Sequence, residues 1–395
     1  MKHEIPGSEG EIKDELHRVK VNDTVDTLCE GLNKIDTRFV QEAIYGITSS
    51  GSVRLSAIAG ALAESIPLHA THKRLSRNLG HERIGGILSE NLLQLSRSLI
   101  GSGSILVLAS ADLEKRYAQS MAFLGEIEGS ERRGYQMCEI TAAGDLNTDW
   151  LSEEYPAPDL VPIAQTFWST SEPGYEDDAQ NILGLASKVF DATSYLGLLI
   201  ASRKYDRRDL LVPWTENSEM RYVVRQRRDS ELLYRSSSRT VRELVDQCTT
   251  PYGATVFLLQ GNDETGLFIH CGFVPVRLPE SPDRPLYLIV VKGLPGEDGA
   301  LLTTEPMRKN RTVIQSVLER YFESFSVTQT SRMMKDDYPF SDVRVLTYDR
   351  LQNMAALLQV ATYFDCFWPA GRATQKGLRF ERRYGKRDTG EWFTI

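Results

Sequence analysis

Two apolar runs that end in small residues constrain this chain more than any other feature. Residues 105–108 (ILVL) are followed by three small residues before the first acid, Asp112, and residues 195–202 (YLGLLIAS) end in a similar way. Runs of this length, bounded by small residues, are typical of buried strands in an α/β sheet. Because ligands of such sheets bind beyond the carboxyl ends of the strands, the sequence predicts a functional site after these runs.

The segments around these runs follow one another in the order of a ribonuclease-H-like sheet. Residues 134–143 and 159–169 are predicted to form two further strands, residues 177–194 a helix, and residues 195–202 the next strand. From Met307 onward the pattern is helical again. We therefore predict an α/β chain with a ribonuclease-H-like mixed sheet and C-terminal helices.

Residues 219–300 differ in character from the segments on either side. Short stretches rich in β-branched and aromatic residues, such as MRYVVRQ, TVRELV and PLYLIVVKG, are separated by glycine and proline turns. This pattern predicts an all-β insertion.

The N-terminal part of the chain is predicted to be helical. Apolar residues recur at helical spacing over residues 22–101, and LSAIAGALAE, a break at Pro67 and HKRLSRNL form a helix-turn-helix pattern. The second helix carries Lys73, Arg74 and Arg77, which suit contact with duplex DNA. A plain helical bundle with a basic outer face explains the same pattern. The predicted organisation is a loose N-terminus (1–21), a helical DNA-binding domain (22–101), the first part of the ribonuclease-H-like domain (102–218), the all-β insertion (219–300), the second part with the C-terminal helices (301–370) and a basic tail (371–395).

Charge, cysteines and hydropathy narrow the classes of protein. The formal net charge of −8 argues against an obligate nucleic-acid binder that is basic over its whole surface. The five cysteines lie far apart without a CxxC pair, so neither a zinc ribbon nor a disulfide framework is expected. No signal peptide is expected, and no apolar stretch reaches the ~18 residues of a membrane helix. We therefore expect a protein of a reduced, cytoplasmic setting, outside the membrane.

Two stretches of the chain are strongly basic despite the acidic total. Residues 221–242 hold seven arginines against two acids, and residues 371–387 hold seven lysines and arginines against one acid. Local basic surfaces bind phosphate even on a protein of negative net charge. The alternative is that these stretches are solvated faces of a large protein.

Several phrases in this order resemble the DDE transposases of bacterial insertion sequences, of the insertion-sequence-4 type. Residues 38–79 resemble the family's N-terminal DNA-binding region, and residues 111–140 resemble its first sheet segment. Residues 202–234 resemble the second catalytic strand, and RYFESF (320–325) resembles the helix that carries the glutamate. The resemblance covers residues 22–368. It implies a fold in which two Asp and one Glu hold two divalent metals that cleave and transfer DNA strands.

On this chain the pattern of the family lacks two of its three acids. Ala109 stands at the position of the first metal-binding Asp and Ser202 at that of the second, whereas Glu323 matches the glutamate. Asp112 matches only an accessory acid of the first phrase. Because Mg²⁺ prefers hard oxygen donors such as carboxylates, alanine offers no ligand and a serine hydroxyl is a poor one. The positions of a helical Tyr, Arg and Lys of the family are held by Ser316, Glu319 and Thr330.

The missing acids leave several interpretations open. In the first, the catalytic site is inactive, Glu323 is a vestige, no metal or cofactor is bound, and the protein acts by binding DNA. In the second, an active transposase or nuclease uses the shifted acids Asp112, Asp206 and Glu323 with Mg²⁺. Against it, Asp112 lies an odd number of residues beyond Ala109, so in a continuing strand it points to the opposite face. Further alternatives are a protein-interaction subunit without DNA binding and an unrelated α/β protein.

We favour a catalytically inactive, transposase-like DNA-binding protein of the bacterial cytoplasm, with a repressor, end-binding or recruitment role. Its expected partners are double-stranded DNA, a second copy of the chain in a dimer, and another protein. The residues expected to contact DNA are basic side chains of the N-terminal helices, the second strand end, the β insertion and the tail: Lys73, Arg74, Arg77, Arg203, Arg207, Arg225, Arg227, Arg228, Arg235, Arg239, Arg379, Arg382 and Arg383.

Overall fold

One long strand, β1 (Ile100–Glu114), lies at the centre of the fold. In the computed structural model it pairs antiparallel with β3 (Arg133–Leu146), from Ser104 opposite Gly144 to Glu114 opposite Gly134. This pairing makes β1 much longer than the apolar run that predicts it. The structure describes residues 24–115, 121–127, 132–148, 157–260, 263–294, 296, 298–308, 311–345, 347–367 and 392–394.

The strands next to β1 set the topology of the sheet. β4 (Leu160–Trp168) pairs antiparallel with β3 on one side. On the other side β5 (Leu198–Ala201) runs parallel to β1, and β6 (Tyr222–Arg225) runs parallel to β5. Helix α6 (Asp178–Ala192) connects β4 to β5, and α7 (Arg208–Glu216) connects β5 to β6. The order β4–β3–β1–β5–β6 is consistent with the predicted ribonuclease-H-like sheet.

The segment predicted as an all-β insertion extends this sheet and also contains a helix. β12 (Gly299–Thr303) pairs with β6, so the sheet continues through β11, β10 and β9. The prediction is wrong for TVRELV, which is mostly helix α8 (Val241–Gln247). A capping box explains it: the Thr240 hydroxyl accepts from the Glu243 amide, and the Glu243 carboxylate accepts from the Thr240 amide. The strands here are β7 (Glu231–Tyr234), β8 (Ser237–Thr240), β9 (Tyr252–Gln260), β10 (Asp263–Leu278) and β11 (Ser281–Lys292).

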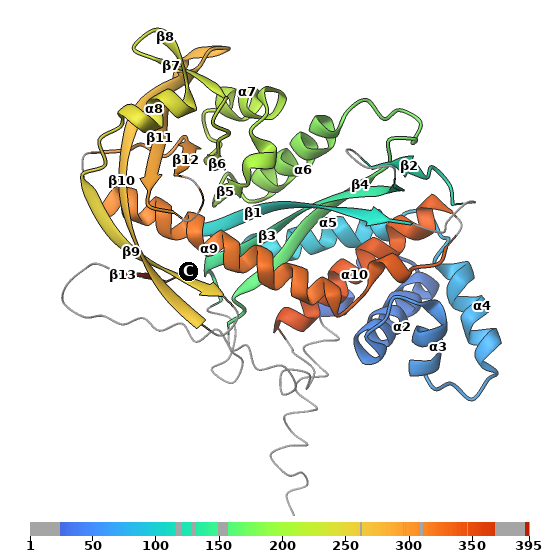
Figure 1. The fold of residues 1–395 in the computed structure, drawn as a ribbon. Coiled ribbons are helices and arrows are strands. Elements are labelled where there is room, and N and C mark those ends of the chain that lie inside the picture. The colour runs from blue at the N-terminus through green and yellow to red at the C-terminus, as the bar shows by residue number, and fades with distance from the viewer. Residues whose placement is uncertain are drawn as a thin grey trace, which may run out of the picture.

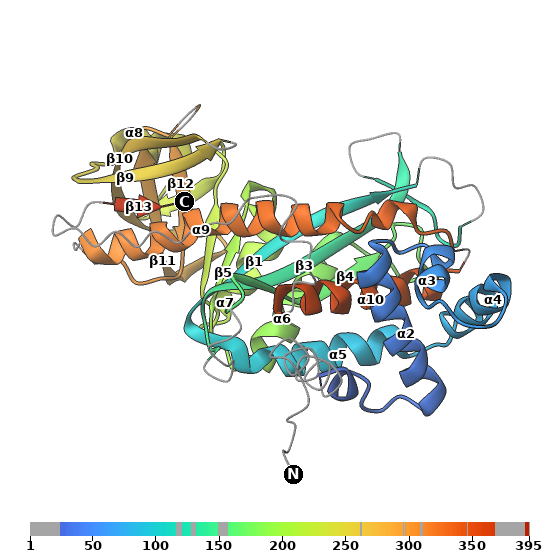
Figure 2. The same ribbon diagram turned by 90° about the horizontal axis from the view of Figure 1, so that it is seen from below.

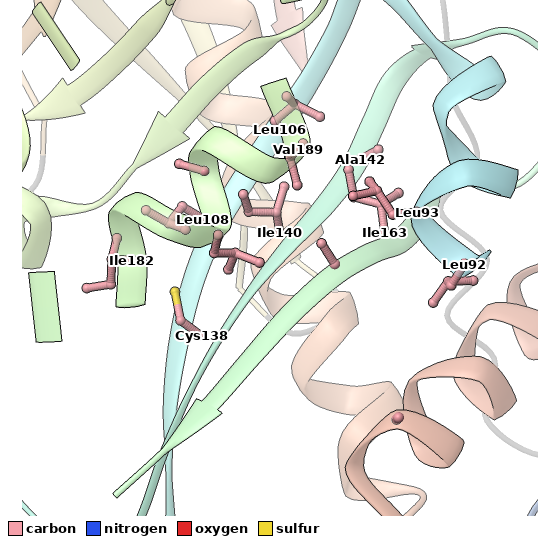
Figure 3. Close-up of a cluster of buried hydrophobic side chains, with 14 of the residues drawn as sticks. Leu92, Leu93, Leu106, Leu108, Cys138, Ile140, Ala142, Ile163, Ile182 and Val189 are labelled. Carbon is pink, nitrogen blue, oxygen red and sulfur yellow. The ribbon is translucent and has the colours of Figure 1, made fainter. Parts of the chain in front are cut away.

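The two faces of β1 belong to two separate hydrophobic cores. Because successive side chains of a strand point to opposite faces, Leu106 and Leu108 lie on one face, and Ile105 and Val107 lie on the other. The second pair packs in the core that includes α9 (Arg311–Asp336). Figure 3 shows the core on the first face, where Leu92 and Leu93 of α5 (Ile84–Ser96) and Ile182 and Val189 of α6 pack against the sheet.

The N-terminal helices pack against the C-terminal helix rather than standing apart. α10 (Tyr348–Phe367) lies against α5, β4 and α2 (Lys34–Ser50) (Figures 1 and 2). The buried amide of Asn353 fastens α10, because it accepts from the Gly85 amide (2.8 Å) and donates to the Leu79 and His81 carbonyls (2.8 and 2.9 Å). Further elements are α3 (Leu55–Ala61), α4 (Leu68–Asn78), β2 (Gly125–Glu126), β13 (Trp392–Thr394) and the short 3₁₀ turns Arg97–Leu99, Arg203–Tyr205 and Phe340–Asp342.

Within the described ranges, no helix combines the length and the apolar character needed to cross a bilayer.

Replacing Asn353 with alanine tests how the C-terminal helix is held. The Asn353→Ala variant leaves a buried amide and two carbonyls without their partner, so we expect the free energy of unfolding to fall by about 2–4 kcal/mol. Chemical denaturation measures this value. The matched control is Asn181→Ala on α6, which removes one 3.3 Å hydrogen bond and is expected to change stability by less than about 0.5 kcal/mol. Equal effects of the two variants would contradict the assignment.

Candidate functional site at the ends of β1 and β5

Four residues form a row across neighbouring strands at the carboxyl ends of β1 and β5. Leu108 pairs with Ala201, so the next residues, Ala109 and Ser202, lie side by side. On the other side of β1, Ala109 lies opposite Glu139 of β3. On the other side of β5, Ala201 pairs with Val224, which brings Arg225 of β6 next to Ser202. The row therefore reads Glu139, Ala109, Ser202, Arg225, with roughly 5 Å between neighbouring strands.

This strand-end row faces helix α9. Ala109 shares its face of β1 with Val107, which packs in the α9 core. Ser331 of α9 donates a hydrogen bond to the Glu139 carboxylate (2.9 Å). The side chain of Ala109 is half-buried and that of Ser202 is exposed. The two positions that resemble those of metal-binding Asp thus lie together, on one face, at an end of the sheet that solvent reaches.

Glu139 is the functional candidate that sequence reasoning missed. It is only 6% exposed, although it carries a carboxylate. The signal was a single acid inside an otherwise apolar strand, GYQMCEITAA. Buried acids are rare unless they have partners, so this position was worth singling out.

Glu323 does not lie at this row. A methyl group on Gly144 would stand 3.6 Å from both Glu323 carboxylate oxygens. Gly144 lies opposite Ser104, five residues before Ala109 along β1, which is roughly 17 Å. Glu323 is also eight residues before Ser331 along α9, which is roughly 12 Å. The described structure therefore brings Ala109 and Ser202 together and leaves Glu323 beside an earlier part of β1.

Asp112 lies on the face of β1 opposite to Ala109. β1 continues through Asp112, which pairs with Gln136, so the odd offset turns its side chain away from the strand-end row. The exposed Asp112 side chain lines a shallow hollow with Trp168 and with Lys204, whose ammonium donates to the Ser110 hydroxyl (2.9 Å).

Asp206 has a structural position in a buried turn. Its side chain is 3% exposed. One carboxylate oxygen accepts from the Arg227 amide (2.6 Å) and from the Ser230 hydroxyl, and the Asp206 carbonyl accepts from the Arg227 guanidinium (2.8 Å). These bonds tie the segment after β5 to the loop after β6. They engage the lone pairs of the carboxylate oxygen Oδ2.

The donors of the strand-end row do not fit Mg²⁺. Mg²⁺ takes oxygen ligands and is bound by carboxylates, whereas the row offers one carboxylate, a methyl group, a hydroxyl and a guanidinium. The described residues contain no group of three His, Cys, Asp or Glu side chains that could hold a metal ion. This set of donors is therefore unsuited to holding Mg²⁺.

Arginines gather on the Ser202 side of the strand-end row. Arg203 directly follows Ser202, and its charge interacts with those of Arg225 and Arg228. Burial lowers the pKa of the Arg203 guanidinium, and the neighbouring charges of Arg225 and Arg228 lower it further. We call Arg203, Arg225 and Arg228 the strand-end arginines.

In the predicted helix-turn-helix, Arg74 is engaged inside the protein. Its guanidinium donates to the Glu42 carboxylate of α2 (2.7 and 2.9 Å) and to the Glu64 carboxylate (2.8 Å). Arg74 therefore fastens α4 to α2 and to the turn before it. Lys73 and Arg77 of α4 are exposed.

The other basic residues expected at DNA differ in their surroundings. Arg207 forms an ion pair with Asp209, and Arg239 lies 3.7 Å from the Glu243 carboxylate. Arg227 is half-exposed beside Asp206, and Arg235 stacks over the Tyr234 ring at 5.1 Å. The tail residues Arg379, Arg382 and Arg383 lie outside the described residues.

Two aspartate variants separate the structural acid from the surface acid. Asp206→Ala removes the buried acceptor that joins two loops, so we expect it to lower the free energy of unfolding by about 2–4 kcal/mol. Asp112→Ala changes an exposed side chain and is expected to cost less than about 0.5 kcal/mol. Urea denaturation of both proteins gives the comparison. An Asp206→Ala protein as stable as the wild type would refute the structural role.

Comparison with known proteins gives likenesses among solved structures but no match by sequence. No model of a known protein family matches the chain. A search of curated proteins also finds no significant match. Among solved structures, a cryo-EM structure of a piggyBac transposase synaptic complex with hairpin DNA is similar, with a TM-score of 0.43 and 13% sequence identity over 85% of this chain and 69% of that one. At this TM-score the likeness carries no weight for function, which has to be argued from the site.

Proposed function

We propose that this chain is a catalytically inactive, transposase-derived protein that binds double-stranded DNA. The observation that carries the proposal is the strand-end row, where Ala109 and Ser202 lie side by side at the two positions that resemble those of the metal-binding aspartates. The sequence resemblance to insertion-sequence-4 transposases supports the proposed transposase origin. The strand-end row supports the proposed inactivity.

The chemistry of two-metal catalysis supports inactivity. The mechanism needs two cations close together, held by carboxylates that offset their charge. In the strand-end row the neighbour of Ser202 is Arg225, and Arg203 follows directly. Guanidinium groups repel a divalent cation and attract a phosphate.

DNA binding is assigned first to helix α4. Its exposed side chains include His69, His72, Lys73 and Arg77, which recur at helical spacing along one face. α3 packs against α4, and Arg74 holds the unit together through Glu42 and Glu64. A basic helix packed across a preceding helix is the arrangement that enters a major groove.

A protein of this kind acts by occupying DNA. Without strand cleavage, the roles that remain are repression, occupation of element ends and recruitment of another protein. The proposal includes a dimer and a bacterial cytoplasmic setting, both by analogy with the transposases that the sequence resembles.

Electrophoretic mobility shifts of duplex DNA test the assignment of α4. We expect the Lys73→Ala/Arg77→Ala variant to bind DNA more weakly. The negative slope of log affinity against log salt should become shallower by about 0.9 for each DNA phosphate that the variant no longer neutralises. The control is Lys188→Ala, which removes a half-exposed lysine paired with Glu90 on a distant surface. If the wild-type protein shifts no duplex at low salt, DNA binding is wrong and the protein-interaction alternative gains support.

A nicking assay tests the inactive site. We expect no Mg²⁺- or Mn²⁺-dependent cleavage of supercoiled DNA or of DNA that carries the flanking sequences of the gene. Cleavage that disappears in Asp112→Asn or Glu323→Gln would instead establish the active transposase with shifted acids. Cleavage that persists in both variants would point to a contaminating nuclease.

A further inference from the structure

The strand-end arginines occupy the position that a catalytic metal site would have in the resembled family. Arg225 ends β6 beside Ser202, Arg203 begins the turn after β5, and Arg228 lies in the loop after β6. Asp206 holds this loop against the turn after β5 through the Arg227 amide and the Ser230 hydroxyl. The three guanidinium groups are therefore carried by segments that are tied to one another before any ligand arrives.

The charge balance of the cluster favours an anion. The three strand-end arginines stay charged at neutral pH because an arginine in a protein is not deprotonated there. Arg203 interacts with Asp206, whose carboxylate already accepts hydrogen bonds from the Arg227 amide and Ser230. It also interacts with Tyr321 of α9, and the Tyr321 hydroxyl forms a hydrogen bond with Arg225. Three like charges held together repel one another, and a bound anion would offset that repulsion.

One donor of the cluster also lacks an acceptor within the described structure. Nη1 of Arg228 is buried and has no hydrogen-bond partner there. A buried donor without a partner is unfavourable, so this atom requires an acceptor that the described protein residues do not supply.

Solvent reaches the strand-end row at Ser202. Ser202 is exposed and Ala109 has only a methyl group, so no long side chain of these two residues covers the end of the sheet. Guanidinium groups bind phosphate oxygens through paired, charge-assisted hydrogen bonds, which makes phosphate the anion that such a cluster fits best.

We propose that Ser202 and the strand-end arginines bind a phosphate group directly, without a metal ion, where the resembled family holds its catalytic metals. The inference deepens the function proposed above, because a phosphate of the DNA backbone is one source of this group. Free inorganic phosphate offers the same chemistry and is the second source.

Thermal unfolding of the full chain with inorganic phosphate tests the site. Melting is measured in sodium phosphate and in sodium chloride at equal ionic strength and pH, with EDTA present. We expect phosphate to raise the Tm of the wild type by about 2 °C or more. The rise should be lost in Arg225→Ala and in Arg228→Gln and kept in Arg132→Ala, a control at an exposed arginine paired with Glu114.

Melting in chloride alone checks the folding of the variants. Arg228→Gln removes an atom without a partner, so its Tm in chloride should match that of the wild type. If Arg225→Ala fails to fold, the Arg228→Gln variant alone decides the test. Absence of a phosphate-specific rise in the wild type, or a rise that persists in Arg228→Gln, would overturn the proposal.

Duplex DNA in EDTA then distinguishes the two sources of phosphate. If the DNA backbone occupies the site, Arg228→Gln makes the negative slope of log affinity against log salt shallower by about 0.9. An unchanged slope, with the Tm effect of phosphate abolished in the same variant, assigns the site to free phosphate. If the wild type binds no DNA, the proposed function fails, and the melting result still decides this inference.

Discussion

The parallel pairing of β1 with β5 sets the chemistry of the candidate site. By placing Leu108 opposite Ala201, it brings Ala109 and Ser202 together at the end of the sheet. The antiparallel partner β3 then adds Glu139, and the parallel partner β6 adds Arg225. Because pairing by one residue more or less would turn every side chain to the opposite face, the two hydrophobic cores fix this register and with it the composition of the row.

The positive charge at the strand ends explains how a protein with a negative net charge can bind phosphate. The whole chain has a formal net charge of −8, yet at physiological ionic strength exposed charges act over only about 8 Å. Within that range Ser202 has Arg225 and Arg203 as neighbours. The local charge beside Ser202 is therefore positive. It favours an anionic ligand, whereas a metal ion requires negatively charged ligands.

Features that depend on local pattern could be predicted from the sequence. The apolar runs at 105–108 and 195–202 contain the β1 and β5 segments that pair with each other, and the odd offset of Asp112 places it away from Ala109, because strand alternation is a property of the backbone. The helix predicted over residues 177–194 is also present, as α6, and Asp177 caps its first turn.

Features that depend on how elements are placed against one another could not be predicted. The position of Glu323 beside Gly144 depends on how far α9 is shifted along the sheet, which the helix sequence alone does not set. The ion pairs of Arg74 with Glu42 and Glu64 join residues from different elements. The β-branched residues of TVRELV predict a strand, but the capping box formed by Thr240 and Glu243 makes the segment helical.

The central claim is that the strand-end row holds no divalent metal in the native protein. Calorimetric titration with Mn²⁺ tests it most directly, with Ala109→Asp/Ser202→Asp as the variant that returns carboxylates to the row beside Glu139. The account predicts no saturable Mn²⁺ binding to the wild type and a gain of binding in the double variant. Saturable binding to the wild type that disappears in Glu139→Gln would contradict the account.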